Sequence, residues 1–98
     1  MAIFHFTGMD RAGGLALRVQ VRPEHLAYAN GGGHVRLGGA LLDTEGHPCG
    51  SVMVIEADDL AHAQRLMAND PYAVAGLFQT TTLFPWRIAI GGLAEPAP

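Results

Sequence analysis

The sequence predicts an α+β fold of the ferredoxin-like type, a βαββαβ sandwich in which a four-stranded antiparallel sheet carries two helices on one face. Two observations predict it. Short runs rich in aromatic and β-branched residues alternate with two segments of helical periodicity, in the order that this fold requires. The length of 98 residues suits one domain, and we expect a single domain over residues 1–98.

The chain opens with an aromatic and apolar run that ends in a glycine, and we expect it to form the first strand, over residues 2–8. The next segment has helical periodicity, but Pro23 interrupts it. Proline cannot continue a helix without losing a backbone hydrogen bond, although it is tolerated at the first position of a new helix. The pattern predicts either a kink near Arg22 or a new helix from Pro23 to about Asn30, stopped by Gly31–Gly33.

The middle of the chain has the composition of two strands joined by a turn. Residues 34–43 form the first of them, the sequence TEGHP forms the turn, and residues 49–57 form the second. The second strand contains the unbroken apolar run Val52–Ile55. An apolar run without alternation is typical of a strand that is covered on both faces.

A second helix follows, with Asp58 as its expected N-cap. A short extra turn then starts at Pro71, with Asp70 at its head. The last strand runs from about Leu77 to Ile88, and the tail from about residue 91 is expected to be loosely ordered. The second helix carries on one face the apolar residues Leu60, Ala63, Leu66 and Met67.

Both faces of the predicted sheet are apolar. Met53 and Ile55 point to one side of their strand, and Val52 and Val54 point to the other. Two helices cover only one face, so a single subunit would expose the other. The pattern therefore predicts a homodimer that packs sheet on sheet. The alternative, a free face that is only moderately apolar, stays open at this point.

Composition excludes several partners. The net charge is −3, and the basic residues are scattered arginines that form no basic stripe, so we expect no nucleic-acid partner. No apolar run approaches the roughly 20 residues of a membrane-spanning helix, and we expect no membrane partner. The N-terminus does not resemble a signal peptide, and the single cysteine, Cys49, fits a reducing compartment. We therefore expect a cytoplasmic protein.

The histidines and glycines predict no metal and no cofactor. His5 alternates with apolar neighbours in the first strand, and His34, His47 and His62 are expected in solvated positions. No HxH, HxxxH or CxxC spacing occurs, so a metal site is not indicated. The glycines at 31–33 are not followed by the lysine and hydroxyl residue of a phosphate-binding loop.

Several segments together carry a resemblance to a known family: RPEHLAYA (22–29), GG before LLD (38–43), GSVMVIEADD (50–59), DPYAVAGLF (70–78) and PWR (85–87). Across nearly the whole chain, about residues 2–90, the sequence resembles the YciI-like (YCII-related) family of the dimeric α/β-barrel superfamily. The resemblance implies a dimer whose two sheets close into a barrel. It also implies a His–Asp pair in a cleft, here His25 and Asp70. It does not imply one reaction.

The pair suits general base catalysis. In a helix that starts at Pro23, His25 would lie in the first turn, where the positive end of the helix disfavours the imidazolium. A nearby carboxylate would favour the charged form and fix the tautomer through the ring N–H. Together they could hold a neutral, oriented imidazole. The alternatives are a structural histidine bonded to a loop carbonyl and an Asp70 that only caps its turn.

Three further residues are candidates for substrate binding. Arg22 and Arg36 could bind an anionic substrate, although an exposed salt bridge is the commoner role, and Ser51 lacks the sequence context of a nucleophile. We expect a small cofactor-independent enzyme, a lyase or isomerase that transfers a proton on a small polar or aromatic-derived substrate. The alternative is a non-catalytic dimer that binds a small ligand in the same cleft. A polar cleft that can stabilise negative charge would favour catalysis.

Overall fold

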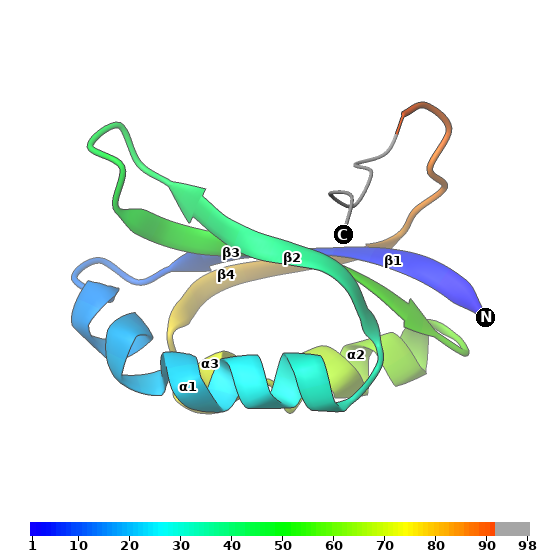
Figure 1. The fold of residues 1–98 in the computed structure, drawn as a ribbon, viewed down its shortest axis with the longest axis horizontal. Helices are drawn as coiled ribbons and strands as arrows, with labels where there is room; N and C mark the ends of the chain where they lie inside the picture. The colour runs from blue at the N-terminus through cyan, green and yellow to red at the C-terminus, as the bar shows by residue number, and fades with distance from the viewer. Residues whose placement is uncertain (92–98) are drawn as a thin grey trace, which may run out of the picture.

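The computed structural model describes residues 1–91 and confirms the predicted fold (Figure 1). Four antiparallel strands form one sheet in the order β2-β3-β1-β4, with the helices on one face. The tail predicted from about residue 91 falls almost wholly outside the described residues. The elements are β1 (Ala2–Asp10), α1 (Leu15–Gly31), β2 (Val35–Leu42), β3 (Pro48–Ala57), α2 (Leu60–Ala68), α3 (Pro71–Val74) and β4 (Phe78–Pro85).

The strand register decides which side chains face the helices. Phe4 lies opposite Ile55 and Phe6 lies opposite Met53, and all four are buried between the sheet and the helices. Because side chains alternate along a strand, the intervening residues of β1 and β3 point to the other face. The core on the helix side is completed by Ala29, Ala57, Ala63 and Met67.

The face away from the helices carries exposed apolar side chains. Leu37 pairs with Val54 and Phe84 pairs with His5, so these residues lie on that face. The exposed fraction is 53% for Leu37 and 62% for Phe84. The structure thus leaves exposed apolar side chains on this face within one chain, although Val54, one of the two residues on which the prediction rested, is itself buried.

Of the two alternatives at Pro23, a kink or a new helix, the new helix is wrong, because one helix, α1, runs through this residue. Pro23 removes a hydrogen bond to the carbonyl of Val19, four residues earlier. Val19 is 65% exposed, so water can solvate that carbonyl. The continuous helix aligns Arg18, Arg22 and His25 along one side, since residues three and four apart share a helix face.

Other element boundaries differ in ways that have local causes. The N-cap of α2 is Asp59 rather than Asp58, because the Asp59 side chain accepts the N–H of His62 at 2.8 Å. In return, the N–H of Asp58 donates to Nδ1 of His62. β1 is longer than expected and reaches Asp10 through an irregularity after Met9.

Candidate active site

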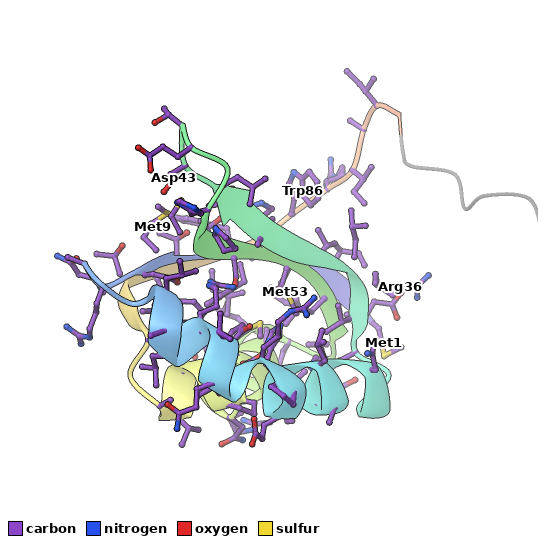
Figure 2. All side chains as sticks on the ribbon, turned by 60° about the vertical axis from the view of Figure 1, so that its left-hand side comes forward. Met1, Met9, Arg36, Asp43, Met53 and Trp86 are labelled. Carbon is purple, nitrogen blue, oxygen red and sulfur yellow. The ribbon has the colours of Figure 1, made fainter. Side chains whose placement is uncertain are left out.

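A cleft of about 370 Å³ lies between α1 and strands β2 and β3. The α1 side contributes Arg18, Arg22 and His25, and Tyr72 of α3 also lines the cleft. In Figure 2, Met53 points into the space between the sheet and α1, while Arg36 lies at its outer edge. The cleft therefore brings together residues of α1, β2, β3 and α3, which lie far apart in the sequence.

His25 and Asp70 meet in this cleft. Nδ1 of His25 lies 2.9 Å from each carboxylate oxygen of Asp70, and both residues are buried. An ionised carboxylate only accepts hydrogen bonds, so this contact is compatible with a proton on Nδ1 of His25. Asp70 Oδ1 also accepts the N–H of Tyr72 at 2.9 Å and caps α3. Asp70 therefore both caps its turn and contacts His25.

The physical setting of His25 differs from the expected one. The residue lies well inside α1 rather than in the first turn of a helix, because α1 begins at Leu15. The partial charge of a helix terminus acts only over the first or last turn, so it does not act on this imidazole. The environment of His25 is set instead by Asp70 and by the ring of Tyr72.

Tyr72 forms one wall against the histidine. Its ring stacks on His25 with centroids 4.0 Å apart and an interplanar angle of 16°. Burial raises the pKa of the Tyr72 phenol, although the charges of Arg18 and Arg22 partly oppose this shift. The phenol therefore stays protonated near neutral pH and can act as a hydrogen-bond donor.

Arg18 is a site residue that the sequence did not reveal. Its guanidinium is buried, with Nε and Nη2 each 2.8 Å from a carboxylate oxygen of Asp10. Nη2 also donates to the hydroxyl of Ser51 at 2.9 Å, and Cζ lies 4.7 Å from the centre of the Tyr72 ring. Burial alone lowers the pKa of Arg18, but the hydrogen bond and charge of Asp10 outweigh it and raise the value. Arg18 is therefore a fixed positive charge.

A signal for Arg18 exists in the spacing of 18, 22 and 25, which places three polar side chains on one face of an unbroken helix. The alternative of a new helix from Pro23, on which the interpretation of His25 was based, hides that signal. Asp10 could not be found in this way, because it lies beyond the expected end of the first strand, at the irregularity that follows Met9.

The three predicted binding residues occupy different environments. Arg22 is exposed and lines the cleft, and Ser51 is buried in its wall. Arg36 lies at the rim, where its side chain is 59% exposed and pairs with Glu56. The structure thus brings Arg22 and Ser51 to the cleft with His25, and it gives Arg36 an acidic partner there.

The expectation of a solvated position is wrong for His34. It is buried, and its ring meets that of Tyr28 at 5.2 Å between centroids. Burial lowers the pKa of His34. By contrast, His5 meets Trp86 on the free face of the sheet, and His47 is exposed. Among residues 1–91, no three His, Cys, Asp or Glu side chains are grouped for a metal ion, and no helix there is long and apolar enough to cross a membrane.

The fold and the cleft define a ferredoxin-like α+β protein with a buried His–Asp pair beside its sheet. The chain belongs to the YCII-related domain family, whose model matches residues 3–87. No curated protein matches the sequence.

Solved structures extend this comparison. The chain is 28% identical to 5-chloro-2-hydroxyhydroquinone dehydrochlorinase from Burkholderia phenoliruptrix, solved with 2,5-dihydroxybenzoquinone; the match covers 89% of this chain and 95% of that one, with a TM-score of 0.82. A NIPSNAP domain protein from Burkholderia xenovorans shares the fold at 16% identity and a TM-score of 0.56, over 96% and 100% of the two chains. Protein Atu4242 from Agrobacterium tumefaciens also shares the fold, with 16% identity and a TM-score of 0.55; the match covers 91% of this chain and 94% of that one.

Proposed function

We propose that the protein is a small cofactor-independent enzyme, a lyase or isomerase, in which His25 removes a proton from a small polar or aromatic-derived substrate. The observation that carries the proposal is the buried contact of His25 Nδ1 with both oxygens of Asp70, each at 2.9 Å, in the wall of a cleft. This contact favours the tautomer whose Nε2 can accept a proton. Asp70 would then stabilise the imidazolium that forms.

The similarity to a dehydrochlorinase supports the class of reaction. The name of this relative denotes removal of a proton and a chloride from one substrate, which is a lyase reaction, and a base such as His25 would accept the proton. The relative's complex with 2,5-dihydroxybenzoquinone supports a small hydroxylated ring as substrate. The cleft volume of about 370 Å³ can accommodate one such ring.

Substrate binding is assigned to the polar residues of the cleft. Arg22 would attract an anionic group at the entrance, and Ser51 would donate a hydrogen bond deeper in the cleft. Arg36 would contribute at the rim if a substrate replaced Glu56 as its partner. This polarity supports catalysis over the alternative of a non-catalytic ligand-binding dimer, because proton removal needs groups that stabilise negative charge.

The proposal includes a homodimer and a cytoplasmic location. The apolar side chains on the free face of the sheet, such as Leu37 and Phe84, support a second copy as the partner. A free cysteine, Cys49, supports a reducing compartment.

A direct test uses 5-chloro-2-hydroxyhydroquinone as substrate, with chloride release and the ultraviolet spectrum of the ring as readouts. The wild-type protein and His25→Gln are compared at equal concentration. His47→Gln is the matched control, because His47 is exposed and lies outside the cleft. We expect release by the wild type and the control, and a loss of about 100-fold or more in His25→Gln.

The same assay separates the two functions. If the ring compound binds to the wild type but releases no chloride, and if it also exchanges no deuterium with the solvent, the ligand-binding alternative is favoured. Release that is unaffected by His25→Gln would contradict the assigned base.

A further inference from the structure

The guanidinium of Arg18 has donors that its protein partners do not use. Its hydrogen bonds employ Nε and Nη2, which reach Asp10 and Ser51. Among residues 1–91, none of these hydrogen bonds uses the remaining amino group, Nη1, and Arg18 and the neighbouring Tyr72 both line the cleft. An arginine of this kind presents a fixed, charged donor to whatever occupies the cleft.

Ser51 has a matching free donor. Its oxygen accepts the hydrogen bond from Arg18 Nη2 at 2.9 Å, so its own hydroxyl hydrogen is free to point elsewhere. Ser51 and Arg18 line the same cleft as His25, and both are buried. Arg18 and Ser51 are therefore hydrogen-bonded neighbours in the wall of the cleft that also contains the proposed base, His25.

The pair Arg18–Asp10 explains how this charge can be held in a buried position. Asp10 occupies one edge of the guanidinium with two hydrogen bonds and offsets the cost of burial. That geometry fixes the plane of the group and turns the Nη1 edge away from Asp10. The ring of Tyr72, 4.7 Å from Cζ, supports the guanidinium from its flat side.

We propose that Arg18 Nη1 and the Ser51 hydroxyl form an oxyanion site, and that the substrate is an enolisable carbonyl compound, cyclic or phenol-derived. The inference rests on the proposed function, since it assigns the group that stabilises the charge created when His25 removes a proton. An isolated C–H bond is far too weak an acid for an imidazole, whereas a C–H next to a carbonyl gives its charge to an oxygen. Preorganised donors aimed at that oxygen lower the barrier.

The step balances without a co-reactant. The C–H bond next to the carbonyl breaks and its proton moves to Nε2 of His25. The electron pair forms a C=C bond, and the π pair of the carbonyl moves to its oxygen, which Arg18 and Ser51 hold as an enolate. The enolate then collapses either to expel a leaving group from the next carbon or to take the proton back from His25 at another carbon. The first outcome is elimination and the second is isomerisation.

The test uses 4-nitrophenol as a probe, because its phenolate resembles an enolate and absorbs at a longer wavelength than the phenol. Binding to the intact protein is followed by absorbance near neutral pH, which gives the ionised fraction of the bound probe and its affinity together. We expect the wild type to bind the phenolate in preference to the phenol. Arg18→Lys, which keeps the charge but not the paired geometry, should weaken phenolate binding roughly 10- to 100-fold. Ser51→Ala should weaken it roughly 10-fold with little effect on folding.

Two comparisons keep the test decisive. Arg65→Lys is the matched control, because Arg65 is exposed on α2 and does not line the cleft. His25→Gln should keep the preference for the phenolate, since the oxyanion site does not need the base. If phenolate and phenol bind equally, or if Arg18→Lys and Ser51→Ala bind the phenolate as tightly as the wild type, the oxyanion site is contradicted. Phenolate binding that depends on Arg18 in a protein without turnover would uphold the site and count against the proposed reaction.

Discussion

Nδ1 of His25 lies 2.9 Å from both carboxylate oxygens of Asp70, although 45 residues separate them in the chain. One of these oxygens also accepts the N–H of Tyr72 and starts the short helix α3. The turn that begins at Pro71 therefore does two things at once. It holds the carboxylate still, and it brings the ring of Tyr72 against the imidazole. The side chain of Asp70 is therefore both the N-cap of α3 and the partner of His25.

The first prediction separates these two roles of Asp70. Asn caps a helix about as well as Asp, so Asp70→Asn should keep the cap of α3, whereas Asp70→Ala should lose the cap and cost about 0.5–2 kcal/mol. Urea denaturation measures the free energy of unfolding for both variants. If Asp70→Ala lowers the free energy of unfolding less than Asp70→Asn does, the cap of α3 contributes nothing to stability.

The second prediction concerns the assembly. The wild type should sediment as a dimer, with twice the 10.3 kDa mass of one chain. Phe84→Glu places a charge on the free face of the sheet and should shift the equilibrium to monomer, because that charge would be buried without a partner. Val19→Glu is the control, since Val19 is exposed on α1, away from that face. A wild type that sediments as a single 10.3 kDa chain at micromolar concentration would contradict the dimer.

The third prediction follows from His34. Burial lowers the pKa of His34 in the folded state, so the unfolded chain takes up the proton first as the pH falls. The contribution of His34 to stability is therefore full above about pH 6.5 and is lost as the pH falls below that value. The free energy of unfolding of the wild type should fall more steeply from about pH 7 to about pH 5 than that of His34→Gln, by at most about 1.4 kcal/mol per pH unit. Parallel pH profiles for the two proteins would contradict this.

The fourth prediction concerns Cys49, which is a free, half-buried thiol. Freshly isolated protein should give one reactive thiol per chain after unfolding, with no change on prior reduction. The measurement is thiol titration beside electrophoresis without reductant. A reducible band at the mass of two chains would contradict the expectation of a reducing environment.

The sequence predicted the order of elements because each one has a local signal. The apolar run Val52–Ile55 and the glycines after α1 are examples, and DPYAVAGLF carried the family resemblance that brought His25 and Asp70 together. The failures came where tertiary contacts override a local rule. Pro23 breaks a helix in isolation, but here the packing of the buried residues of α1 on both sides of it keeps the helix continuous.

The same override hid part of the site. Arg18 lies on the same helix face as His25 only if the helix is continuous. Its partner Asp10 follows an irregularity in β1 that no local sequence pattern predicts. His34 gave no sign of burial, because it follows three glycines and precedes a strand. Its burial depends on Tyr28 and on the way α1 lies against the sheet.

The measurement that tests the central claim most directly is the tautomer of His25, determined from the ring nitrogen chemical shifts of ¹⁵N-labelled protein in long-range ¹H–¹⁵N spectra. His25→Gln assigns the signals. The account predicts a neutral ring protonated at Nδ1, with Nε2 unprotonated and available to accept a proton, and a change of that pattern in Asp70→Asn, where the acceptor is an amide. A neutral ring protonated at Nε2 in the wild type, or an identical pattern in Asp70→Asn, would leave Asp70 as a helix cap only and would contradict His25 as the oriented base.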